Sequence, residues 1–182
     1  MSFDREAALR AATLLFWRHG YEGASVAALV EAMGVTPPSL YAAWGSKRGL
    51  FREAVAAYVG GPTAEGATAR EVARAMLEGS AGLFTGEGTP RGCLLATAAI
   101  TGSHGSADVR AEVAAVRRGI EAGLRARIEA GIAAGEMPVG TDAEALAGLV
   151  MAVIQGLSTL ARDGASRARL MAVADAAMLA WP

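Results

Sequence analysis

The chain has few of the residues that build β-sheets and disulfide-stabilised folds. Of its 182 residues, 5% are aromatic and one is a cysteine. A single cysteine excludes an internal disulfide and suits the reducing cytoplasm. No stretch alternates apolar and polar residues with a period of two, and alanine, the strongest helix former, is abundant. The composition therefore predicts an all-α fold.

Charge-free segments of membrane-spanning length are also missing. No run without a charged residue reaches the ~18 residues that a membrane-spanning helix needs, so we expect no membrane partner. The N-terminus lacks the basic and then apolar segment of a signal peptide. These two features lead us to expect a cytoplasmic protein.

The overall charge gives no sign of a nucleic-acid partner, because the net charge is −1. Residues 1–59 carry six basic and five acidic side chains, and residues 60–182 carry eleven and thirteen. Lys47 is the only lysine of the chain. Any nucleic-acid site must therefore depend on a local motif and not on global charge.

Residues 25–51 contain two short helical patterns separated by a glycine. Ser25 can cap the first helix, and Gly34 stands where a left-handed stop residue belongs. Thr36 can cap the second helix, with Pro37 in its first turn, where a missing N–H costs nothing. The apolar residues of the first helix share one face: Val26, Leu29, Val30 and Met33. This arrangement is typical of a helix-turn-helix, whose second helix fits the major groove of DNA.

A preceding helix, an aromatic residue after the second helix and a following lysine keep register with this motif. The residues are Gly20-Tyr21, Ser25-Val26, Ala32, Gly34-Val35, Tyr41, Trp44, Lys47 and Leu50-Phe51. Over about residues 5–58 the pattern resembles the TetR/AcrR family of bacterial transcription regulators. The resemblance implies a DNA-binding domain over residues 1–59, followed by a larger helical ligand-binding and dimerisation domain over residues 60–182.

Helical periodicity, with glycine and proline as stops, predicts about nine helices. The first four are expected at about 4–19, 25–33, 36–44 and 46–59, and Gly60-Gly61-Pro62 ends the fourth. The remaining five are expected at about 68–84, 92–101, 106–134, 141–161 and 166–181.

Seven residues are predicted to contact DNA: Ser25, Thr36, Pro37, Pro38, Ser39, Tyr41 and Lys47. Lys47 opens the fourth helix, where a cation and outward-pointing backbone N–H groups can bind a phosphate. The resemblance implies this role for Lys47 and for the hydroxyl of Tyr41; the alternatives are a solvated charge and a half-buried packing tyrosine. Gly23 and either Arg5 or Arg48 are weaker candidates for contacts with the DNA backbone.

The surface of the second helix lacks the Arg, Asn and Gln side chains that read bases through paired hydrogen bonds. We therefore expect readout through thymine methyl groups, hydroxyls and DNA shape. Leu40 and Trp44 are expected in the core. Gly49 is expected to loosen the start of the fourth helix, because glycine in a helix costs about 1 kcal/mol relative to alanine.

Two further sets of residues belong to the larger domain. Its glycines and methionines suggest a core with room for an apolar molecule, and the resemblance implies an inducer there; the alternative is ordinary packing. The ligand candidates are Met76, Leu83, Leu95, Ile100, Val113, Val116 and Ile120. The last two helices, apolar and poor in charge, suggest a homodimer interface, with an internal hairpin as the alternative. The interface candidates are Leu146, Val150, Val153, Leu157, Leu170, Ala174 and Met178.

No catalytic constellation, cofactor motif or metal-ligand spacing is present. Cys93, among apolar sequence neighbours, is expected to be a core residue and not a thiol sensor. We therefore expect a homodimeric repressor that a small apolar effector releases from a palindromic operator in double-stranded DNA. The alternatives are a transcriptional activator and a ligand carrier with a vestigial DNA-binding head.

Overall fold

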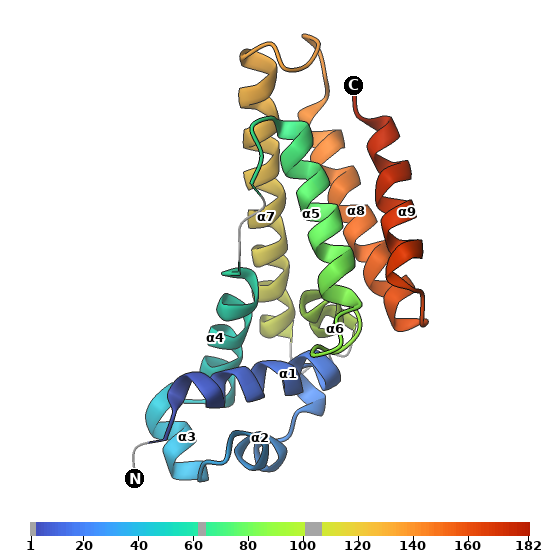
Figure 1. Cartoon of the computed structure of the whole chain (residues 1–182). Coiled ribbons are helices and arrows are strands. Elements are labelled where there is room, and N and C mark those ends of the chain that lie inside the picture. Colours follow the sequence, from blue (N-terminus) through green and yellow to red (C-terminus); the bar gives the residue numbers. More distant parts are fainter. Residues whose placement is uncertain (1–2, 62–64, 101–106) are drawn as a thin grey trace. The chain divides into compact units, whose positions relative to one another are not determined.

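The structure, a computed structural model, describes residues 3–61, 65–100 and 107–182, without the side chains of 98–100. Every regular element in these ranges is helical (Figure 1), as the composition predicted. The helices are α1 Arg5–Gly23, α2 Val26–Met33, α3 Pro37–Trp44, α4 Lys47–Val59, α5 Ala69–Phe84, α6 Leu94–Ile100, α7 Ala107–Ala133, α8 Ala143–Arg162 and α9 Arg167–Ala177, followed by a 3-10 helix, Met178–Ala180.

The contacts between residues divide the chain into two units. The first contains Met1–Pro62 and Leu94–Ala114, and the second contains Thr63–Cys93 and Ala115–Pro182. This grouping differs from the predicted division after residue 59, because α6 packs against α1 and the start of α7 contacts α4. Helix α7 therefore contributes residues to both units.

The first unit is built around α1, which contacts α2, α4 and α6. Asp4 caps α1 by accepting from the N–H groups of Glu6 and Ala7. The helix is broken at Gly20, whose φ of 73° is accessible mainly to glycine. This break agrees with the predicted end of the first helix. The fully buried side chains of the first unit include Phe16, Leu29, Leu40, Leu50, Phe51 and Leu94.

The helix-turn-helix is confirmed in its local details. Ser25 accepts from the N–H of Ala28 and caps α2. Gly34 ends that helix in the left-handed conformation, with φ 64° and ψ 33°. Thr36 caps α3, and Pro37 is the first residue of that helix.

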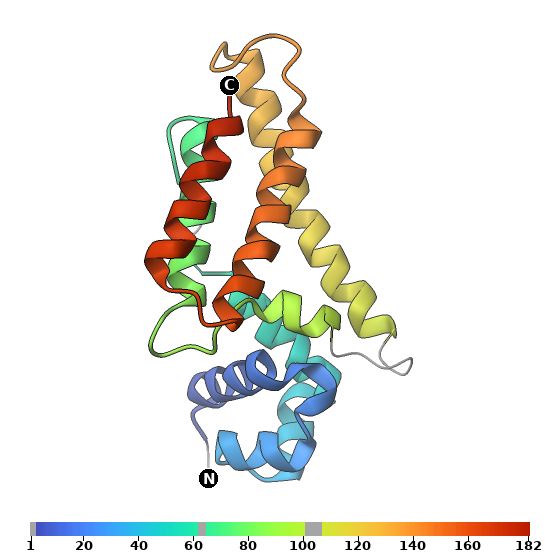
Figure 2. The same cartoon turned by 90° about the vertical axis from the view of Figure 1, so that its right-hand side faces the viewer.

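The second unit contains α5, α8 and α9 packed side by side (Figures 1 and 2). A capping box at Thr68 and Glu71 starts α5. Glu136 also accepts from the N–H of Ala69 at 2.8 Å and pairs with Arg127 at 2.9 Å. The unit's fully buried side chains include Leu77, Phe84, Ile128, Leu157, Leu170 and Met178.

Helix α8 is long and apolar enough to cross a membrane, with a mean hydropathy of 1.5 over an 18-residue window. In this fold it instead contacts α5 and α9. Its buried Ser158 accepts from the backbone N–H of Cys93 at 2.9 Å. Cys93 is buried, as expected, and lies just before α6. Gly92 has φ +85°, and a Cβ at that position would meet Arg162 and the Ser158 carbonyl, so this segment lies closely against α8.

The junction between α3 and α4 corrects the expectation for Gly49. A Cβ on Gly49 would lie 2.1 Å from the carbonyl oxygen of Trp44. The first turn of α4 therefore approaches the backbone at the end of α3 more closely than any side chain permits. Gly49 allows this contact instead of loosening the helix.

We expect the Gly49→Ala variant to be less stable by about 1–3 kcal/mol, because the α3–α4 junction must open to admit the methyl group. Urea unfolding measures the change. Gly119→Ala, in α7, is the control: its Cβ meets nothing within 4 Å. Because alanine is the better helix former, this control should be more stable than the parent by about 0.5–1 kcal/mol. Equal stabilisation of both variants would contradict the close contact.

Candidate nucleic-acid interface

The outward side of α3 presents short polar and apolar side chains. Thr36, Pro37 and Pro38 are exposed, and Ser39 is half-buried. Tyr41 is 47% exposed, so its hydroxyl is accessible to a partner. Leu40 and Trp44 are buried, as predicted. Helix α3 thus turns an apolar side inward and its small hydroxyl-bearing side outward.

The hydroxyls at this surface also hold the local structure. The Oγ1 of Thr36 lies 2.9 Å from the Oγ of Ser39 and accepts from its N–H. The Oγ of Ser25, exposed at the start of α2, accepts from the N–H of Ala28 at 3.1 Å. A capping hydroxyl with neighbouring N–H groups at a helix N-terminus can also meet a phosphate. The two roles are compatible.

Lys47 lies in the first turn of α4, as predicted, and is half-buried. Its Nζ lies 4.6 Å from the ring centroid of Tyr21, a cation–π contact. Burial lowers the pKa of Lys47, and the carboxylate of Glu22 acts in the opposite direction. Tyr21 itself packs against the rings of Phe16 and Phe51. The aromatic core of the unit therefore supports the ammonium group.

The end of α3 is joined to α1 and α4 by polar contacts that no local sequence pattern indicates. The Nε1 of Trp44 donates to Glu53 at 3.1 Å. Arg5 donates to both carboxylate oxygens of Glu53, at 2.7 and 2.8 Å, and its guanidinium lies 5.0 Å from the Trp44 ring. These contacts fix the orientation of α3, the second helix of the helix-turn-helix, within the unit.

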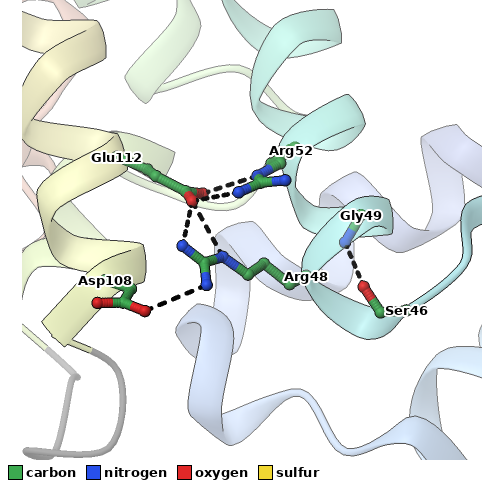
Figure 3. Close-up of polar contacts among 6 residues, drawn as sticks. All are labelled: Ser46, Arg48, Gly49, Arg52, Asp108 and Glu112. Atoms are coloured by element: carbon green, nitrogen blue, oxygen red, sulfur yellow. Dashed lines mark hydrogen bonds and ion pairs between the residues drawn. The ribbon is translucent and has the colours of Figure 1, made fainter.

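Figure 3 shows a second set of ion pairs, between α4 and the start of α7. Arg52 donates to both oxygens of Glu112, at 3.0 and 2.6 Å. Arg48 donates to the same carboxylate, through its Nε at 3.0 Å and through Nη2. Arg48 also pairs with Asp108 at 3.2 Å. In this geometry the Arg48 guanidinium pairs with carboxylates of α7, which does not support a contact between Arg48 and the DNA backbone.

These ion pairs strongly shift the pKa of Glu112. Hydrogen bonds from Arg52 and then Arg48 lower the pKa of Glu112 from 4.5 to about 2, although partial burial acts in the opposite direction. The same bonds raise the pKa of Arg48 and that of Arg52. Glu112 therefore remains charged at any physiological pH.

The ligand candidates divide between the two units. Leu95 and Val113 are buried in the first unit. In the second unit Met76, Val116 and Ile120 are half-buried, and Leu83 is 39% exposed. The side chain of Ile100 lies outside the described residues. No group of three or more His, Cys, Asp or Glu side chains that could hold a metal ion occurs in residues 3–61, 65–100 and 107–182.

All of the dimer-interface candidates belong to the second unit, and most of them are buried in its core. Five of them are buried: Val150, Leu157, Leu170, Ala174 and Met178. Leu146 and Val153 are half-buried. The periodicity of α8 and α9 identified the side that packs within the chain. The side left exposed contains Leu149, Ala152 and Gly156, spaced three and four residues apart on α8.

A capped helix-turn-helix with an exposed second helix, joined to a helical unit, defines the class of helix-turn-helix regulators. Residues 8–54 match the family described as bacterial regulatory proteins, tetR family, and residues 69–177 match the tetracyclin repressor-like C-terminal domain. The chain belongs to the tetR family of bacterial regulatory proteins, which confirms the resemblance seen in the sequence.

Three proteins illustrate the similarity. The HTH-type transcriptional repressor ComR of Escherichia coli K12 is 36% identical over 188 residues, covering 99% of this chain and 90% of ComR. The HTH-type transcriptional repressor BdcR of the same strain is 48% identical over 58 residues, 32% of this chain and 29% of BdcR. A solved complex of a cysteine mutant of the TetR family regulator CifR with 26-bp operator DNA is 45% identical, with a TM-score of 0.93 and coverage of 100% and 99%.

The low pKa of Glu112 predicts a pH-dependent contribution to stability. The carboxylate pairs stabilise the fold fully above pH 4.5, and this contribution is lost as the pH falls from 4.5 towards 2. We expect the Glu112→Gln variant to be less stable than the parent at neutral pH, with the difference shrinking below pH 4.5. Urea unfolding at a series of pH values tests this. A difference that stays constant down to pH 2 would contradict it.

Proposed function

We propose that this protein is a DNA-binding transcriptional repressor. The observation that carries the proposal is the exposed outer side of α3 in a helix-turn-helix whose α4 begins with Lys47. Relatives support it: ComR is named a transcriptional repressor and covers almost the whole chain, and CifR has been solved on operator DNA. Helix α3 enters the major groove, and Lys47 contacts a phosphate of the backbone.

The proposed DNA contacts are those predicted from the sequence: Ser25, Thr36, Pro37, Pro38, Ser39, Tyr41 and Lys47. Helix α3 contains no Arg, Asn or Gln. Base readout therefore depends on apolar contacts with thymine methyl groups, on the hydroxyls of Thr36 and Ser39, and on sequence-dependent DNA shape. Such a site discriminates operators through many weak contacts.

The repressor acts as a homodimer on a palindrome, with recognition helices about 34–36 Å apart. The interface forms on the exposed side of α8, where Leu149 is 37% exposed and Ala152 and Gly156 are small enough for close helix approach. The buried members of the predicted set, such as Leu157, support this side from beneath.

An uncharged, apolar effector that binds the larger domain weakens operator binding in this proposal. The half-buried apolar side chains of Met76, Val116 and Ile120 in the second unit are the first candidates to contact it. Such an effector needs a differential affinity for two conformations of about 1–3 kcal/mol. Release of DNA by a compound that binds the protein is the test of this step.

The decisive experiment is a mobility-shift assay with the DNA that flanks the protein's own gene, at several salt concentrations. A discrete, salt-sensitive complex of two chains on one palindrome is the expected result. Weak binding that is indifferent to sequence on every fragment tested would count against the repressor and favour a carrier.

We expect Lys47→Ala to weaken binding to all DNA sequences and to reduce the salt slope by about one, because one phosphate contact is lost. Titrations of operator and non-operator DNA at several salt concentrations measure both effects. Arg125→Ala is the matched control, since Arg125 lies in the second unit and pairs with Glu129. An unchanged salt slope in Lys47→Ala would show that Lys47 does not contact the backbone.

We expect Leu149→Glu to convert the dimer to a monomer, because burying an unpaired carboxylate at the interface costs several kcal/mol. Analytical ultracentrifugation measures the mass. Val139→Glu is the control, at a position 96% exposed in the loop before α8. A Leu149→Glu protein that stays dimeric would place the interface elsewhere.

A further inference from the structure

One carboxylate on α7 holds two arginines of α4. Glu112 accepts four hydrogen bonds, two from Arg48 and two from Arg52. Asp108, one turn earlier on α7, accepts a further hydrogen bond from Arg48, the third that Arg48 donates to α7 (Figure 3). The Glu112 side chain is 29% exposed and that of Arg48 36%, whereas that of Arg52 is 60% exposed, so solvent screens the Arg48 pair less than the Arg52 pair.

The two arginines lie on one face of α4, because they are four residues apart. Without a carboxylate between them, their like charges would repel each other and destabilise the first turns of that helix. Paired guanidinium–carboxylate contacts are directional, so they set the position of the helix as well as neutralising its charge. Glu112 thus determines where the first turns of α4 lie relative to the start of α7.

Those same turns carry the groups proposed to meet DNA. Lys47 precedes Arg48 directly, and Gly49 lies against the Trp44 carbonyl at the end of the recognition helix. Glu53, next to Arg52, accepts from the Nε1 of Trp44. A displacement of α4 therefore displaces α3 as well, because close backbone and side-chain contacts join the two helices.

We infer that Glu112 is a positioning residue for operator binding, which holds Lys47 and the recognition helix in one DNA-competent arrangement through Arg48 and Arg52. The inference rests on the proposed function and adds a residue that lies more than fifty positions beyond the helix-turn-helix. Glu112 touches no DNA in this arrangement. Its effect is on the geometry of the groups that do.

The test compares two substitutions that break the same contact with opposite changes of charge. Glu112→Gln makes the protein more positive, and Arg52→Gln makes it more negative. If Glu112 acts by positioning, both variants bind operator about fivefold more weakly or worse. If it acts only by its charge, Glu112→Gln strengthens operator binding and Arg52→Gln weakens it, and this opposite response would overturn the inference.

Non-specific DNA separates positioning from loss of folding. Binding to non-operator DNA should be unchanged or stronger in Glu112→Gln, because this binding depends on charge and not on one exact arrangement, and the variant is more positive. An equal loss on operator and non-operator DNA, together with a thermal midpoint near the assay temperature, would mean a merely structural role and overturn the inference. Glu112→Asp keeps the carboxylate and should restore most of the operator affinity.

Glu129→Gln is the matched control on the same helix, since Glu129 pairs locally with Arg125, four residues away. It should bind operator like the parent. A parent protein that binds no operator would reject the proposed function itself. A parent that binds operator while Glu112→Gln binds equally well would reject only the role of Glu112.

Discussion

The contact between Gly49 and the carbonyl of Trp44 is the constraint on which the arrangement of the DNA-binding unit depends. It lets the first turn of α4 lie directly against the end of the recognition helix. Trp44 can donate to Glu53 only because α4 passes close to the end of α3, and Lys47 reaches the Tyr21 ring from the same turn.

Helix α4 then serves two neighbours with different kinds of contact. Its buried side, with Leu50 and Phe51, enters the apolar core beside α1. Its polar side carries Arg48 and Arg52 to the carboxylates of α7. Apolar packing is tolerant of small slides, whereas paired guanidinium contacts are directional. Apolar packing therefore sets how closely α4 lies against the core, and the ion pairs set the rotation of α4 about its own axis.

Local features of the fold were predictable, because caps and stops act within a few residues: Ser25, Gly34, Thr36 and Pro37 all behave as the sequence indicated. The role of Gly49 was not, because its reason is a backbone contact with another helix. The partner of Arg48 and Arg52 lies 60 or more residues away, and no local pattern gives its position.

One signal in the sequence was available for that contact. Like charges four residues apart on a helix destabilise it, so a nearby carboxylate was to be expected. The periodicity of α8 likewise indicated an apolar side. It did not show whether that side packs against a helix of the same chain or against a second chain.

The use of arginine inside the fold bears on how such a protein distinguishes DNA sequences. Of the six basic side chains in residues 1–59, four form ion pairs within the chain: Arg5, Arg10, Arg48 and Arg52. Little positive charge remains to attract DNA of any sequence, so non-specific affinity should be low. Operator affinity must then come from many short-range contacts made at once. Contacts of this kind require a rigid recognition helix, and Arg5, Arg48 and Arg52 contribute to that rigidity through their ion pairs instead of binding phosphates.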